Sequence, residues 1–252
     1  MAAKAKRRIF CAAAVLLSLG VIAQAEISEP FGLFTAAVRE GPLWVIWRQL
    51  QLQMREEKPI ISQCRAEPNS CRLPAALRFI AIVKEGEKFE GRARIGHINR
   101  TANFAIRAIN DTTPNGVRRR WTSPLATLAG GVGDCKQYAI LKYAALSDAG
   151  FALNDLRLVI LGTKSPQRLQ HAVVAVRSEG HWLILDNRSM ALVDSHEILD
   201  HYIPLFMLDH HGIREFIQRA PPGRSMASTN CDSETVDGTF TRRLDHKKLR
   251  GH

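Results

Sequence analysis

Three residues of this chain could together form a thiol nucleophile: Cys135, His171 and Asp186, in that order along the sequence. A histidine that accepts the thiol proton gives a thiolate–imidazolium pair, and a carboxylate beside the ring orients it and fixes its tautomer. Taken singly, each residue has a commoner structural interpretation: a small buried cysteine, a strand-end histidine bonded to backbone, and the start of an Asp-Asn turn. Their order and their expected secondary structure together favour the catalytic interpretation.

The cysteine is expected in the first turn of a helix. The glycines of residues 130–133 allow a sharp backbone turn, Asp134 is a good N-cap residue, and apolar residues at helical spacing follow until Gly150. At such a position the positive end of the helix dipole favours thiolate over thiol. The free N–H groups of the first turn could also help to bind an oxyanion.

The histidine and the aspartate are expected on a β-hairpin. Apolar and β-branched residues predict strands over residues 156–161, 171–176 and 182–186. A loop of two or four residues centred on Glu179-Gly180 places His171 and Asp186 on one face of the hairpin, diagonal to each other. A three-residue loop would put them on opposite faces. The register therefore decides whether the pair can form.

The cysteines indicate an oxidising compartment. Cys64 and Cys71 flank a Pro-Asn-Ser turn, and we expect them to form a disulfide. A zinc site is the alternative, but no second Cys/His pair stands at suitable spacing. Cys11 lies in the N-terminal apolar run and Cys231 near the C-terminus, which leaves Cys135 as a free thiol within the expected domain.

The first 25 residues have the pattern of a signal peptide. Four basic residues precede an apolar run over residues 9–22, and Ala23-Gln24-Ala25 fits a signal-peptidase site, so cleavage is expected after Ala25. The run is short for a membrane span of about 20 residues, and an uncleaved anchor is the alternative. We expect an exported, soluble protein that is periplasmic or secreted.

The rest of the chain divides into a domain and a tail. Residues 26–219 fit one domain of ordinary size. Residues 220–252 open with Pro221-Pro222-Gly223, are rich in Ser, Thr and charge, and are expected to be disordered. We expect the domain to be a monomer.

The basic charge does not indicate a nucleic-acid-binding protein. The formal net charge of +11 falls to +7 when the four basic residues of the first 25 are removed. The remaining charges are scattered, and the tight cluster Arg118-Arg119-Arg120 lacks interleaved aromatic residues beyond Trp121. An export signal also argues against nucleic acid as a partner. A basic surface still favours acidic partners or anionic envelope surfaces.

A metal site is a weaker interpretation of a second group of residues. The candidate ligands are His196, His201, Asp209, His210 and His211. Their spacing fits no helix-borne ligand pair except His196 with Asp200, and solvated histidines explain them equally well. We predict no metal site.

The sequence resembles the bacterial transglutaminase-like cysteine peptidases, the family that includes the LapG-type periplasmic adhesin proteases. The resemblance rests on the segments Trp121-Thr122-Ser123-Pro124, Gly133-Asp134-Cys135, Tyr138-Ala139-Ile140-Leu141-Lys142, His171-Ala172-Val173 and Leu185-Asp186-Asn187-Arg188. It implies a papain-like α+β fold of the transglutaminase type, in which the nucleophile-bearing helix packs on an antiparallel sheet. It further implies that Cys135, His171 and Asp186 form the triad, and that a large surface protein such as an adhesin is cleaved in the periplasm.

The resemblance also suggests further site residues and a further partner. Trp121, Asp134 and Lys136 are candidates for lining the substrate cleft or supporting the oxyanion site. A regulatory protein at the inner membrane would be a second partner beside the protein substrate.

One departure from the family concerns calcium. LapG-type members carry acidic residues directly after the nucleophile and bind calcium beside it, whereas this chain has Lys136 and Gln137 there. Calcium prefers several oxygen ligands, and an ammonium would repel it. We predict no tight calcium site and no cofactor, and we expect Lys136 to help stabilise the thiolate instead.

Three functions remain open at this stage. The first is a cysteine endopeptidase, and the second is acyl transfer to an amine, because water or lysine can resolve the same thioester. The third is a catalytically silent module that binds a peptide. The intact triad disfavours the third.

Overall fold

The computed structural model describes residues 29–110, 120–164 and 170–217. The expected signal peptide, the expected tail, Cys231 and most of the arginine cluster lie outside these residues. Within them, no helix is both long and apolar enough to cross a membrane.

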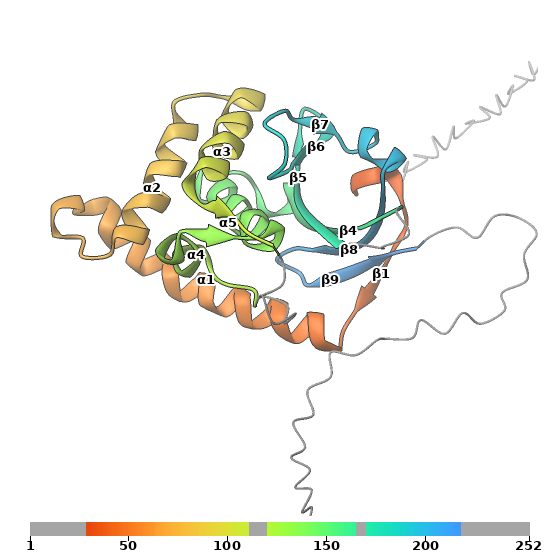
Figure 1. Cartoon of the computed structure of the whole chain (residues 1–252), viewed down its shortest axis with the longest axis horizontal. Helices are drawn as coiled ribbons and strands as arrows, with labels where there is room; N and C mark the ends of the chain where they lie inside the picture. The colour runs from red at the N-terminus through yellow and green to blue at the C-terminus, as the bar shows by residue number, and fades with distance from the viewer. Residues whose placement is uncertain (1–28, 111–119, 165–169, 218–252) are drawn as a thin grey trace, which may run out of the picture.

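A seven-stranded sheet forms one side of the molecule (Figure 1), with the strand order β1-β9-β8-β4-β5-β6-β7. All of its strand pairs are antiparallel. Its strands are β1 (Thr35–Val38), β4 (Leu156–Thr163), β5 (Gln170–Ser178), β6 (His181–Leu185), β7 (Val193–Asp194), β8 (Tyr202–Leu208) and β9 (Ile213–Phe216). This arrangement confirms the predicted α+β class and all three predicted strands.

The α-helices of the described residues lie on the other side (Figure 1). They are α1 (Pro42–Ala66), α2 (Pro74–Glu87), α3 (Gly91–Ala105), α4 (Pro124–Gly130) and α5 (Cys135–Asp148). Helix α5 packs on β4 and β5 of the sheet and also contacts α2, α3 and α4. It is therefore buried almost all round, which explains why its sequence is apolar on nearly every face.

The central strands are buried on both faces because apolar side chains alternate into two cores. In β4, Leu158 and Ile160 join the larger core shared with the helices, while Val159 and Leu161 join a smaller core on the opposite face. Both faces being covered, these strands appear in the sequence as continuous apolar runs.

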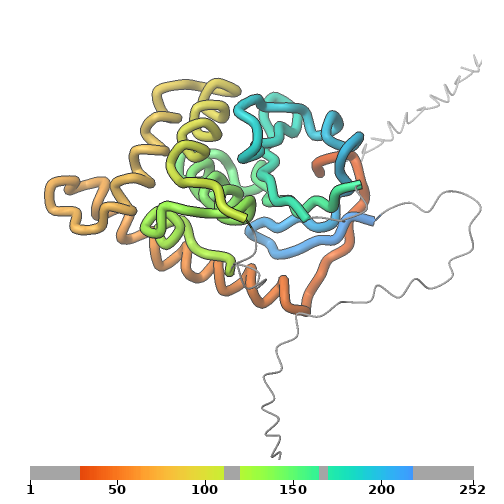
Figure 2. The backbone as a smooth tube through the Cα atoms, in the orientation of Figure 1, coloured from red at the N-terminus to blue at the C-terminus, as the bar shows by residue number. Residues whose placement is uncertain are grey.

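The two ends of the described chain meet in the sheet. Strand β1 pairs with β9, with Thr35 opposite Phe216 and Val38 opposite Ile213. Figure 2 shows the N-terminal and C-terminal segments side by side at this edge. Short elements complete the fold: the 3-10 turns η1 (Pro30–Gly32), η2 (Pro68–Ser70), η3 (Leu153–Asp155) and η4 (Glu197–Asp200), and the parallel pair β2 (Arg107–Ala108) and β3 (Val132–Gly133).

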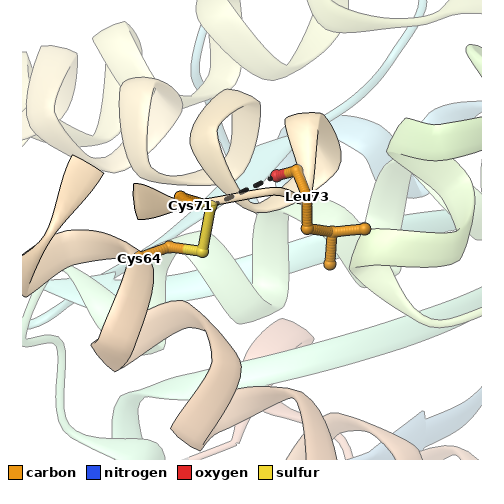
Figure 3. The surroundings of a disulfide bond; sticks show 3 residues. All are labelled: Cys64, Cys71 and Leu73. Atoms are coloured by element: carbon orange, nitrogen blue, oxygen red, sulfur yellow. Dashed lines mark hydrogen bonds between the residues drawn. A yellow bond between two sulfur atoms is a disulfide. The ribbon is translucent and has the colours of Figure 1, made fainter. Parts of the chain in front are cut away.

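The expected disulfide joins Cys64 and Cys71, with an S–S distance of 2.08 Å (Figure 3). It closes the connection between the end of α1 and the start of α2 through η2. The disulfide, and not the alternative zinc site, is the correct interpretation of these two cysteines.

Candidate active site

Cys135 is the first residue of α5 and is half-buried, as the sequence predicts. The helix begins with a capping box at Asp134. The Lys136 N–H donates to the Asp134 carboxylate at 2.9 Å, and the Asp134 N–H donates to Gln137 Oε1 at 3.0 Å. Reciprocal bonds of this kind fix where the helix starts and so fix the position of the thiol.

Glycines bring the preceding chain close to this helix. Gly131 ends α4 in the left-handed conformation, with φ of 66°. A Cβ atom at Gly133 would lie 2.8 Å from the Cβ of Gln137 and 2.9 Å from Cδ1 of Ile106. Only glycine therefore allows β3 to pass this close to the first turn of α5.

The hairpin has the register that the catalytic pair requires. Arg177 pairs with Trp182, and Ser178 pairs with His181, so the loop consists of Glu179 and Gly180. Both loop residues have positive φ, 53° and 81°, as the turn that matches the twist of a hairpin demands. Of the loop lengths that the sequence leaves open, the structure has the two-residue loop, which places His171 and Asp186 on one face.

As a result His171 and Asp186 meet. Nε2 of His171 lies 2.9 Å from each oxygen of the Asp186 carboxylate. Because a carboxylate only accepts, this nitrogen carries the ring proton. The Arg188 N–H also donates to Asp186 Oδ1 at 2.9 Å, which holds the carboxylate in place.

The surroundings of His171 and Asp186 shift the pKa of both side chains. Burial by itself lowers the pKa of His171, but the bond to Asp186 and the nearby Cys135 thiol raise it above its ordinary value. Burial by itself raises the pKa of Asp186, but His171, the Arg188 N–H and the charge of Lys142 bring it below its ordinary value. Asp186 is therefore ionised at neutral pH, and the protonated imidazole is favoured.

Nδ1 of His171 is the ring nitrogen that does not bind Asp186. It is buried and has no hydrogen bond to any acceptor in the described part of the chain. With Nε2 held by Asp186, Nδ1 of the neutral ring is unprotonated and can accept the proton of Cys135. The structure thus brings His171 against Asp186, and Cys135 lies near enough to act on the same ring.

Two asparagines that the sequence reading did not single out hold the segment around Asp186. The Asn103 amide donates to the carbonyl oxygens of Asp186 at 3.2 Å and Ser189 at 3.3 Å. The Asn99 amide donates to the carbonyl oxygens of Ser189 at 3.2 Å and Met190 at 3.5 Å. Their spacing of four residues places both on one face of α3. This four-residue spacing is the one feature of the sequence that could have indicated that the two asparagines act together.

Two more residues were missed. The ring of Tyr202 stacks on His171, with centroids 5.8 Å apart, and its hydroxyl accepts from Arg188 at 3.3 Å. Lys142, seven residues after Cys135 on α5, is completely buried. Nothing local in the sequence distinguishes either residue from a solvent-facing one.

The remaining candidates lie near the nucleophile. Trp121 is half-buried against the larger core, which Cys135 also borders. Gln137 ties this segment to α5, because its amide donates to the carbonyl of Arg120 at 2.5 Å. Nζ of Lys136 lies 2.9 Å from Asp134 Oδ2. The roles of Trp121, Asp134 and Lys136 toward a substrate remain predictions.

Asp209, one of the candidate metal ligands, has structural partners. Asp209 Oδ1 accepts from the N–H groups of His211 and Gly212 in the turn between β8 and β9, and Oδ2 lies 3.5 Å from Nε of Arg157. Across the described ranges, no group of three His, Cys, Asp or Glu side chains is arranged to hold a metal ion.

Comparison with known proteins agrees with this geometry. Residues 56–204, more than half of the chain, match the model of a family described as bacterial transglutaminase-like cysteine proteinases. Comparison with curated protein sequences found no match.

Solved structures share the fold. LapG of Legionella pneumophila aligns with a TM-score of 0.50 at 20% identity, over 63% of this chain and 86% of LapG. Its calcium-bound form aligns with the same score and identity, over 68% of this chain and 93% of LapG. The family match, over a domain with this arrangement of helices and sheet, shows that the chain belongs to the bacterial transglutaminase-like cysteine proteinases and is a cysteine peptidase.

Proposed function

We propose that the chain is an exported cysteine endopeptidase that uses Cys135 as nucleophile, His171 as proton carrier and Asp186 as orienting acid. The observation that supports this most strongly is Nε2 of His171 at 2.9 Å from both Asp186 oxygens, with the thiol of Cys135 near the same ring. A structural histidine would need neither the carboxylate nor a thiol at a helix start.

The reaction follows from these positions. Nδ1 of His171 takes the thiol proton, and Sγ of Cys135 attacks the carbonyl carbon of the scissile peptide bond. The C–N bond breaks as the imidazolium returns its proton to the leaving amine, which leaves a thioester. Water, deprotonated by His171, then attacks the thioester and releases the carboxylic acid and the free thiol.

The start of α5 provides an oxyanion donor in this proposal. The N–H groups of the second and third helical residues are taken by Asp134. The N–H of Cys135 is the first-turn amide that remains, and amides there have no partner within the helix. The half-buried Trp121 is the candidate for a second donor.

The proposed substrate is a large cell-surface or periplasmic protein, such as an adhesin, with an inner-membrane regulator as a further partner. The signal-like first 25 residues and the disulfide in the structure support an oxidising compartment outside the cytoplasm. The match to a family of cysteine proteinases supports a protein as substrate.

Activity is proposed to be independent of calcium. Lys136 directly follows the nucleophile, and its ammonium, 2.9 Å from the Asp134 carboxylate, already holds that carboxylate and would repel a calcium ion. Activity of the purified protein should be unchanged by a calcium chelator. A chelator that abolishes activity, with recovery on adding calcium, would contradict this.

The decisive experiment compares exported proteins of a Cys135→Ala strain with those of its parent. A large exported protein should remain uncut in the variant. Cys231→Ser is the matched control and should behave like the parent. If no exported protein changes, the endopeptidase proposal fails. Incorporation of a labelled amine into the same protein would instead indicate acyl transfer, and a normal phenotype with retained binding would indicate a silent binding module.

A further inference from the structure

A buried lysine lies on the helix that carries the nucleophile. Lys142 follows Cys135 by seven residues, so the two side chains project from the same side of α5. Its side chain is 0% exposed, and its Nζ has no hydrogen-bond partner within the described residues. A buried ammonium without such a partner is unfavourable, and an apolar residue of the same length would avoid the cost. The charge therefore requires an explanation.

Two groups face this ammonium. The first is the carboxylate of Asp186, whose negative charge acts on Lys142 and is itself affected by the lysine. The second is the ring of Tyr138 on α5, whose centroid lies 6.0 Å from Nζ. On β5, the titratable neighbour of that carboxylate is His171. On α3, the polar side chain that reaches Asp186 is the Asn103 amide, which does not titrate.

Asp186 is therefore surrounded by donors and positive charge. His171 binds its carboxylate, the Arg188 N–H binds one of the same oxygens, and Asn103 binds its carbonyl oxygen. When it is protonated, Lys142 adds a positive charge from the interior of the protein.

We propose that Lys142 is a positioning residue of the triad, whose ammonium balances the Asp186 carboxylate and so sets the protonation of the Cys135–His171 pair. This inference rests on the proposed function. With thiolate, imidazolium, carboxylate and ammonium present, the site has no net charge. Without the lysine, the active ion pair would leave one uncompensated negative charge in a buried place.

The expected effect has a definite sign. A positive charge favours negative charge on the groups near it, so the charged Lys142 should favour the site with Cys135 as thiolate, and its removal should disfavour that state. Burial lowers the pKa of Lys142 itself to about 7, with Asp186 opposing the shift. Replacing the lysine should therefore shift the lower limb of the pH profile of Cys135 alkylation, where the thiolate forms, to higher pH. The upper limb, where Lys142 is already neutral, should stay in place.

The test measures the alkylation rate of Cys135 by iodoacetamide as a function of pH, by mass spectrometry of the peptide that contains it. No substrate is needed. In Lys142→Met the midpoint of thiolate formation should rise by about one pH unit. Lys84→Met makes the same change at an exposed position on α2 and should leave the midpoint unchanged.

The outcomes separate this inference from the proposed function. If the alkylation midpoint of wild-type Cys135 is the ordinary thiol value of about 8.5, the result would contradict the proposed triad itself. A low wild-type midpoint that does not move in folded Lys142→Met would overturn only the role of the lysine.

A second measurement covers the case in which Lys142→Met does not fold. The ¹³Cε resonance of Lys142 can be titrated in the wild-type protein and in Asp186→Asn. Removing the carboxylate should lower the pKa of Lys142 further, because the anion that favours its charged form is gone. An unchanged titration would overturn the proposed coupling.

Discussion

Lys136 and Lys142 lie six residues apart on the same helix, in opposite electrostatic environments. Nζ of Lys136 is 2.9 Å from the Asp134 carboxylate, and its side chain is 14% exposed. Nζ of Lys142 is fully buried and has no hydrogen-bond partner among the described residues. The first charge is neutralised locally by the helix cap. The second charge acts on Asp186 without a direct bond. We therefore attribute Lys142 to the active site and not to the stability of the fold.

The largest effect on activity is expected when Asp186, the acid whose charge Lys142 balances, is replaced. Asp186→Asn keeps the shape of the side chain but favours the wrong tautomer of His171. The value of kcat/KM should fall by about 10⁴-fold, as in other triads whose acid is replaced by its amide. Steady-state kinetics of the two purified proteins measures this. A loss of less than tenfold would remove Asp186 from the triad.

Lys142→Met should stabilise the protein. The folded-state pKa of Lys142, about 7, lies below its ordinary value of 10.5, so protonation favours the unfolded chain. That penalty is fully present below about pH 7 and disappears as pH rises toward the unfolded value. Urea unfolding near pH 7 should show a gain of about 1–3 kcal/mol that shrinks toward pH 10. A loss of stability at neutral pH would contradict this account of the buried charge.

Asn103→Ala should lower activity by about tenfold, because the backbone of Asp186 loses a donor and the carboxylate shifts. Asn99→Ala is the matched control, since its amide binds the same segment but not Asp186. Each variant should lose about 1–3 kcal/mol in chemical unfolding. Equal losses of kcat/KM in both would show that the whole segment, and not Asp186, is what the asparagines position.

The smallest effect is expected for Lys136→Met. This variant loses an ion pair whose side chains are 14% and 3% exposed, but Asp134 keeps the bond from the Lys136 N–H, so the free energy of unfolding should fall by about 1 kcal/mol. The sign is opposite to that for Lys142→Met. If both lysine variants change stability in the same direction, the contrast between the two environments is wrong.

The elements that carry the triad could be predicted from local patterns. Local signals are the turn at residues 130–133, the N-cap Asp134 and the alternation of β5 and β6. Glu179-Gly180 indicated a hairpin, but the sequence left the length of its loop open. The pairing of β1 with β9 joins segments far apart in the chain, which local periodicity does not specify.

The residues that were missed are polar side chains in buried places. Lysine is almost never fully buried, so Lys142 within an apolar helix pattern gives no warning of its position. Asn99 and Asn103 could equally have faced solvent. Their burial depends on how α3 packs beside the segment after β6, which is a tertiary property.

The central claim is that Cys135 and His171 form an ion pair oriented by Asp186. The most direct measurement is the pH dependence of Cys135 alkylation in the wild-type protein and in His171→Ala. The account predicts that Cys135 is alkylated faster at neutral pH in the wild type than in His171→Ala, because the histidine takes the thiol proton. Equal alkylation rates in the two proteins at neutral pH would contradict it.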